Sequence, residues 1–270
     1  MKCLNNNPVF TVALGMILSS VAFVATGHDT WVQSSAPLVR PGDLVHVSLG
    51  LGNHGNNHRD FKFAGKLSSL EHATIEVIAP DGRRTDLIPS VIDLGYAPRE
   101  GFYSARHIVA EQGLHTVAHT LDTLHHTTRA IKSGKTHFLV AESLDRPEQP
   151  EGTLPAPLGH PLELVLESHP VLDCGPGQPI AVQLLFNGAP LPDHVVSFIP
   201  RGATLSEGFD PEYERTTDAD GRCHYTPREG NLVLVVTHLM KPQETGEGYD
   251  KTAYAATLVV DVPQRCACCE

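Results

Sequence analysis

Histidine side chains are the main chemical feature of this sequence, because their ring nitrogens can bind metal ions. The chain contains 16 histidines in 270 residues, and histidine is not among the commonest residues of an average protein. Neutral imidazole is the commonest metal ligand in proteins. Nitrogen ligands favour copper, nickel or zinc over calcium or magnesium. One site needs only about three or four ligands, so we expect most of these histidines to be ordinary surface residues.

His28 is the first candidate ligand, because an apolar stretch ends immediately before it, at Gly27. Cleavage of the chain after Gly27 would leave His28 with a free α-amine beside its imidazole. These two groups can chelate one ion, and the reference pKa of the amine, about 7.7–8.0, requires only modest proton release at neutral pH. One further histidine nitrogen would make a site that resembles a histidine brace. The alternative is that His28 begins an ordinary first strand.

A loop rich in glycine and asparagine supplies two further candidates, His54 and His58. They lie four residues apart in the sequence NHGNNH, residues 53–58. Asparagine and glycine favour turns, so this loop can bring both imidazoles to one ion. The alternative is a solvated polar loop that binds nothing.

Two more candidates, His119 and His238, lie in expected strands. His238 follows Leu234 and Val236 on the same face of its strand. A histidine that ends an apolar stripe is more often a hydrogen-bonded core residue than a ligand, because an unpaired buried polar group is costly. The predicted metal site therefore draws on five histidines: His28, His54, His58, His119 and His238.

Five cysteines follow the apolar leader, an odd number for an exported protein. In an oxidising compartment Cys174 and Cys223 could form a disulfide. Cys266, Cys268 and Cys269 lie at the end of the chain, where their thiolates could hold a soft ion such as Cu(I) or zinc. The alternative for this tail is a disulfide within it or to another chain, because exposed thiols oxidise.

The first 27 residues have the composition of a secretory signal peptide. Lys2 supplies the positive charge, residues 10–24 are almost entirely apolar, and small residues follow. The apolar run is short for a membrane span, and no second run of spanning length follows. We expect a periplasmic or secreted protein without stable membrane insertion after cleavage. The formal net charge of −11 argues against a nucleic-acid partner.

Short apolar and β-branched runs, separated by glycine, proline, asparagine and aspartate, predict an all-β protein made of antiparallel sandwiches. No long helical period interrupts them. The expected strands are 44–50, 73–79, 104–110, 114–120, 136–141, 162–168, 179–188, 194–200, 222–227, 232–238 and 253–262. Turn signals occur at 80–82, 112–113, 187–188 and 218–221.

A segment rich in proline and acidic residues divides these strands into two groups. Residues 142–157 contain four prolines and four acidic residues, a composition typical of an extended linker. We predict two sandwich domains in tandem, immunoglobulin-like or transthyretin-like. The predicted parts are a signal peptide (1–27), an N-terminal domain (28–141), the linker (142–157), a C-terminal domain (158–262) and a cysteine-rich tail (263–270).

The sequence resembles the DUF4198 group of exported proteins. The resemblance rests on the opening His28-Asp29-x-Trp31, the segment KTHFLV at 135–140, and GHPLE at 159–163. It also rests on the hairpin with the sequence NGAPLP, the turn TDADG, and the strand LVLVVTH that ends at His238. The group is described as a periplasmic component of cobalt or nickel uptake. The resemblance therefore implies a divalent transition metal as ligand and, for an uptake role, a membrane metal transporter as partner.

The expected function is that of an exported, non-enzymatic protein that binds nickel, cobalt, copper or zinc. The sequence contains no nucleophile elbow, phosphate-binding loop or HExxH motif. Two alternatives remain. One is a structural sandwich module of the cell envelope that binds no metal. The other is a copper-dependent oxidative enzyme with a histidine brace at its amino terminus.

Overall fold

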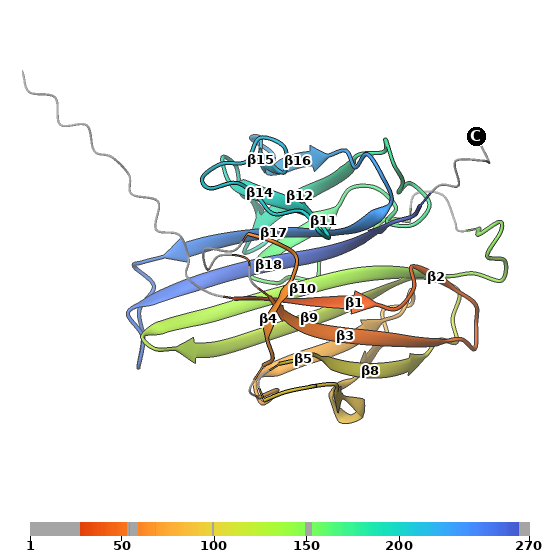
Figure 1. Ribbon diagram of the computed structural model, residues 1–270, viewed down its shortest axis with the longest axis horizontal. Helices are drawn as coiled ribbons and strands as arrows, with labels where there is room; N and C mark the ends of the chain where they lie inside the picture. Colours follow the sequence, from red (N-terminus) through yellow and green to blue (C-terminus); the bar gives the residue numbers. More distant parts are fainter. Residues whose placement is uncertain are drawn as a thin grey trace, which may run out of the picture.

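The protein is built from β-strands, which confirms the predicted all-β class (Figure 1). The computed structural model describes residues 28–52, 54, 59–67, 69–98, 100–148 and 153–264. Within these ranges the only helix is the short 3-10 helix η1 (Ile88–Ser90), and no helix is long and apolar enough to cross a membrane. The predicted signal peptide lies outside the described residues.

Eighteen strands follow one another along the described part of the chain. The first ten are β1 (Asp29–Ser34), β2 (Leu38–Val39), β3 (Leu44–Gly52), β4 (Phe63–Gly65), β5 (Ala73–Ile78), β6 (Arg84–Asp86), β7 (Ile92–Asp93), β8 (Tyr103–Ile108), β9 (Gly113–His125) and β10 (Thr128–Val140). The remaining eight are β11 (Leu162–Leu166), β12 (Ile180–Phe186), β13 (Ala189–Pro190), β14 (Val195–Pro200), β15 (Glu214–Thr216), β16 (Arg222–Tyr225), β17 (Asn231–Lys241) and β18 (Lys251–Val262).

These strands form three sheets that stack in layers (Figure 1). The central sheet has the order β15-β14-β17-β18-β10-β9-β5-β6, with β2 paired to β10. The N-terminal sheet contains β1-β3-β8-β7 with β4, and the C-terminal sheet contains β11-β12-β13 with β16. Successive residues of a strand point to opposite faces. On β18, Leu258 packs into the core beneath the C-terminal sheet, whereas Val259 packs with Trp31 of the N-terminal sheet. The two smaller sheets therefore cover opposite faces of the central sheet.

The central sheet runs through both predicted domains. Strand β10 from the N-terminal segment pairs in parallel with β18 from the C-terminal segment, from Thr128 opposite Lys251 to Thr136 opposite Val259. The described part of the predicted linker contains no strand. The boundary at 142–157 stays a prediction, but the two segments on either side of it share one hydrogen-bonded sheet.

Local sequence signals account for most strand ends. Asn187 and Gly188 both adopt positive φ, 50° and 78°, and join β12 to β13 as the hairpin signal predicts. At residues 218–221 the Asp218 carboxylate accepts the backbone N–H groups of Asp220 and Arg222, each at 2.9 Å. This segment therefore forms a plain turn whose first carboxylate is used by its own backbone.

Strand β1 is the element that carries the first candidate residues into the molecule. It pairs with β3, so that Asp29 lies opposite Gly52 and Trp31 opposite Gly50. The Trp31 ring occupies the space over both glycines: a Cβ at Gly52 would lie 1.7 Å from a ring carbon. Trp31 also packs edge-on against Phe61, with ring centroids 5.1 Å apart. This packing holds the start of β1 against the end of β3 and against the central sheet.

The cysteines of the C-terminal segment do not form the expected disulfide. Cys174 and Cys223 are free thiols. Burial raises their pKa values to about 11 and about 12, so neither is a thiolate at neutral pH. Cys266, Cys268 and Cys269 lie outside the described residues.

Candidate functional site

The first strand and the penultimate strand bring Asp29 and His238 into direct contact. The Nε2 atom of His238 lies 2.8 Å from Oδ1 and 3.0 Å from Oδ2 of Asp29. Asp29 is only 1% exposed, whereas the His238 side chain is 22% exposed. His238 was among the predicted ligands, whereas Asp29 was not. The signal for it was an acidic residue at the start of an otherwise buried strand.

His54 completes this group, which we call the histidine cluster (Asp29, His54 and His238). The rings of His54 and His238 are stacked, with centroids 5.1 Å apart and planes inclined by 13°. His54 follows the end of β3 at Gly52, and Gly52 pairs with Asp29. The β1–β3 register therefore places His54 beside the carboxylate that contacts His238.

The His54 ring is buried but not fully satisfied. It is 5% exposed, and its Nδ1 atom has no hydrogen-bond partner. Burial, together with the neighbouring charge of His238, lowers the pKa of His54 to about 4. The ring is therefore neutral at pH 7. Leaving such a buried polar atom unpaired costs about 1–3 kcal/mol.

The charge of Asp29 is balanced from two sides. Burial alone would raise its pKa, but the charge and hydrogen bond of His238, with smaller contributions from His54 and Lys132, lower the pKa overall. Burial lowers the pKa of Lys132, and the charge of Asp29 partly opposes this. The Lys132 ammonium donates a hydrogen bond to the backbone oxygen of His28. Asp29 is thus a buried carboxylate whose pKa is lowered by its contact with His238 and by the nearby Lys132.

His28 precedes Asp29, and the charged groups that act on its ring are Lys132, Asp29 and His125. The His28 side chain is partly buried. Burial lowers its pKa, and the charge of Lys132 adds to this while that of Asp29 opposes it. A neutral ring has the protonation state that a metal ligand needs.

His119 has a different environment from the other candidates. Its Nδ1 donates to the backbone oxygen of Thr74 at 2.8 Å, and its Nε2 lies 3.0 Å from the hydroxyl of Thr30. Burial lowers its pKa to about 4. Both ring nitrogens are used inside the core, so His119 has no nitrogen left for an ion in this arrangement. His58 lies outside the described residues.

The histidine cluster has two imidazoles, but not a complete set of metal ligands. Among the described ranges, no three histidine, cysteine, aspartate or glutamate side chains are arranged as a group that could hold a metal ion. Asp29 is engaged with His238, and a third donor is not in position. What the cluster offers is an unpaired nitrogen on His54, a second ring in contact with it, and a carboxylate that orients the second ring.

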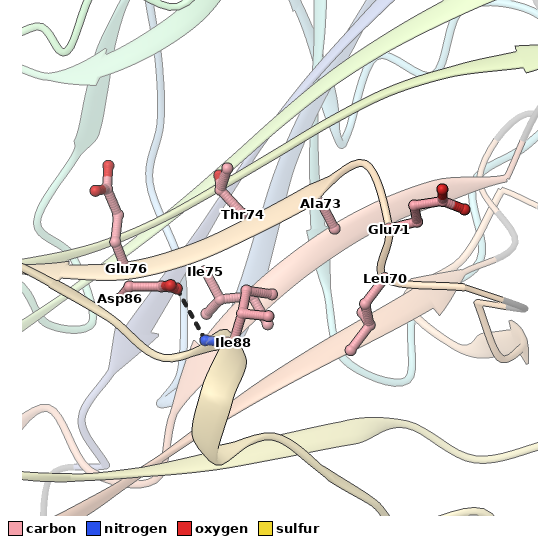
Figure 2. Close-up of a pocket in the computed structure, with 8 residues that line it drawn as sticks. All are labelled: Leu70, Glu71, Ala73, Thr74, Ile75, Glu76, Asp86 and Ile88. Carbon is pink, nitrogen blue, oxygen red and sulfur yellow. Dashed lines mark hydrogen bonds between the residues drawn. The ribbon is translucent and has the colours of Figure 1, made fainter.

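A shallow hollow of about 470 Å³ lies elsewhere, beside β5 and η1 (Figure 2). Its acidic groups are engaged locally: Asp86 accepts the backbone N–H of Ile88 at 2.9 Å, and Glu76 pairs with Arg84 at 2.5 Å. In Figure 2, Glu71 and Glu76 extend from opposite ends of the hollow. The hollow therefore lacks convergent polar groups, and the histidine cluster is the better candidate site.

Comparisons with known proteins give a family and a loose structural likeness. A family model described as "Domain of unknown function (DUF4198)" matches residues 25–241. No protein with a curated description matches the chain. The similar solved structures include a DUF4785 family protein from Legionella pneumophila, at 10% identity and a TM-score of 0.30, over 76% of this chain and 50% of that one.

Two further structures have comparable likeness. Trypsin-activated alpha-2-macroglobulin from Escherichia coli matches at 14% identity and a TM-score of 0.26, over 89% of this chain and 16% of that one. The Yersinia pseudotuberculosis adhesin InvE matches at 12% identity and a TM-score of 0.23, over 88% of this chain and 61% of that one. The chain thus spans half or less of the length of the first two proteins.

Proposed function

This chain belongs to the DUF4198 family, and we propose that it is an exported protein that binds one divalent transition metal ion at the histidine cluster. The proposal includes export through the predicted signal peptide and a role in nickel or cobalt uptake, or in copper or zinc handling. A membrane metal transporter is the partner that such a role requires. The family description names no activity, so the proposal depends on the cluster itself.

One observation carries the proposal: the buried Nδ1 of His54 has no partner and lies beside a second imidazole. An unpaired buried nitrogen is costly, and a bound ion would remove that cost. His54 has a pKa of about 4, so it needs no deprotonation to bind an ion at neutral pH. The rings are nearly parallel, with centroids 5.1 Å apart, so one of them would have to turn before a nitrogen of each ring could lie about 2.0–2.1 Å from one ion.

The residues fit a transition metal better than a hard cation. His54 and His238 would supply two nitrogen donors, and His28, which precedes Asp29 in the chain, is the predicted third. Water would complete the coordination, as it does at open metal sites. Nitrogen donors without thiolates favour nickel, cobalt, copper or zinc in the divalent state. The free thiols of Cys174 and Cys223 belong to the core under the C-terminal sheet and are not part of the proposed site.

Titration calorimetry on the stripped mature protein tests the proposal. We expect about one equivalent of Ni²⁺, Co²⁺, Cu²⁺ or Zn²⁺ to bind with at least micromolar affinity, about −8 kcal/mol. His54→Ala and His238→Ala should each abolish this binding. His224→Ala is the matched control, because His224 is an exposed histidine on β16, and it should bind like the wild type. If none of the four ions binds, the protein is better described as a structural module of the envelope.

A further inference from the structure

We propose that Asp29 is a positioning residue that fixes the tautomer of His238, so that the ion is bound through Nδ1 of His238 together with Nδ1 of His54. This inference rests on the proposed function, because it assigns donor atoms within the same site. Asp29 was not among the predicted site residues.

The hydrogen-bond geometry determines which nitrogen of His238 carries the proton. Both oxygens of Asp29 lie within 3.0 Å of Nε2 of His238. An ionised carboxylate can only accept, so Nε2 must be the donor. In the neutral ring the lone pair is then on Nδ1. The donor atom of His238 is therefore assigned by its contact with Asp29.

The position of Asp29 makes this contact rigid. Its side chain is almost completely buried, and its backbone is held in the β1–β3 register opposite Gly52. The groups that face it are His238 from β17, His54 after β3, and Lys132 from β10. Since both oxygens are directed at His238 Nε2, Asp29 acts through that ring rather than as a ligand itself.

A carboxylate behind a ligating histidine has a known physical effect. It holds the ring in one orientation and tautomer, and it makes the ligating nitrogen more basic. Loss of such an outer partner lowers metal affinity by about 10–100-fold. Nδ1 of His54 is the matching donor atom, because it is the ring nitrogen of His54 that is buried without a hydrogen-bond partner.

Nitrogen-15 NMR of the metal-free protein tests the tautomer assignment without any metal. The variants are Asp29→Asn, which keeps the shape of the side chain, and Asp29→Ala. The control is Asp93→Asn, which removes a half-exposed carboxylate paired with Lys66. At a pH where the ring is neutral, His238 in wild type and in Asp93→Asn should carry its proton on Nε2. Both Asp29 variants should show a mixture of tautomers, because an amide can donate as well as accept.

Addition of Zn²⁺ to the same samples tests the donor atoms. In the wild type, Zn²⁺ should shift the Nδ1 resonances of His54 and His238, and Asp29→Asn should bind it about 10–100-fold more weakly. Circular dichroism and the melting temperature establish that each variant is folded.

Three results would overturn the proposal. The first is an unchanged tautomer in both folded Asp29 variants. The second is a zinc-induced shift at Nε2 of His238 instead of Nδ1. The third is wild-type zinc affinity in Asp29→Asn. Wild-type protein that binds none of Ni²⁺, Co²⁺, Cu²⁺ and Zn²⁺ overturns the proposed function as well, whereas zinc binding that is independent of Asp29 overturns the positioning role alone.

Discussion

Two buried histidines of this protein each have an unpaired Nδ1, yet their surroundings differ. One is His54 in the histidine cluster, and the other is His160 at the start of the C-terminal segment. Burial lowers the pKa of each to about 4. His54 has a second imidazole stacked on it, backed by a carboxylate. His160 instead lies close to Lys135 and Glu163, whose charges act on it in opposite directions.

Glu163 forms a structural ion pair, and both oxygens of its carboxylate accept hydrogen bonds. Lys135 donates to Glu163 at 2.7 Å, and both side chains are almost completely buried. The same carboxylate accepts backbone N–H groups from Leu158, Gly159 and His160 at 2.6–3.1 Å. It therefore anchors the chain after the predicted linker to β10. An unpaired nitrogen alone does not mark a metal site, and its neighbours decide what it can bind.

Removal of Lys135 should produce the largest effect on stability. Lys135→Ala leaves the Glu163 carboxylate buried without its cation, which costs about 3–5 kcal/mol. Denaturant-induced unfolding measures this change. The double variant Lys135→Met with Glu163→Gln should recover much of the loss, because no unpaired charge remains. If Lys135→Ala lowers the free energy of unfolding by less than about 1 kcal/mol, water must hydrate the Glu163 carboxylate. The region would then differ less from the histidine cluster.

The two unpaired histidines should differ most in metal binding. His54→Ala should weaken the binding of Ni²⁺ or Zn²⁺ by at least about 100-fold, roughly 2.7 kcal/mol. His160→Ala should leave the affinity unchanged, because Lys135 lies near that ring and repels a cation. Titration calorimetry on both folded variants measures the difference. Equal losses of metal affinity in the two variants would show that the two histidines do not differ as metal ligands.

The two histidines should behave alike in the pH dependence of stability. Each has a pKa of about 4 in the folded protein and about 6.5 when unfolded. The unfolded chain therefore binds more protons between pH 6.5 and 4, so the free energy of unfolding is largest above pH 6.5 and falls as the pH drops. Each ring contributes up to about 1.4 kcal/mol per pH unit in this window.

Unfolding experiments from pH 7 to pH 4.5, without metal, measure this slope. His54→Ala and His160→Ala should each reduce the slope by the contribution of up to one proton, about 1.4 kcal/mol per pH unit. His224→Ala, which removes an exposed histidine of β16, serves as the control. A slope that stays unchanged in both variants would show that these rings bind protons equally in the folded and unfolded states.

The smallest expected effect concerns the amino terminus. If the α-amine of His28 is a ligand, one alanine inserted before His28 should weaken metal binding about tenfold, roughly 1.4 kcal/mol. His28→Ala should weaken it at least as much, because the ring is lost. Amino-terminal sequencing of the exported protein provides the check: a first residue other than His28 removes the amine from the proposed site and leaves only its ring.

Local patterns were sufficient to predict most of the long strands, but not β1, which carries Asp29, and not which strands are neighbours. The expected strands and the turns at Asn187-Gly188 and Gly82 are present, since alternation and positive-φ residues act over a few positions. The length of β9 and β10, 13 residues each, was underestimated. Polar residues such as Lys135 and His137 are buried in β10, and burial of that kind has no signature in a pattern of apolar residues.

The sequence by itself determined the all-β class, the positions of most long strands, and the fact that His238 shares a face with Leu234 and Val236, which pack in the core around Trp31. Only the tertiary structure decided that His238 meets Asp29 across 209 residues and that His119 is occupied by Thr30 and Thr74. The physical reason is that a period of two tells which face a side chain occupies. Which strands pair, and which sheet covers that face, depends on packing between segments that are distant in the chain.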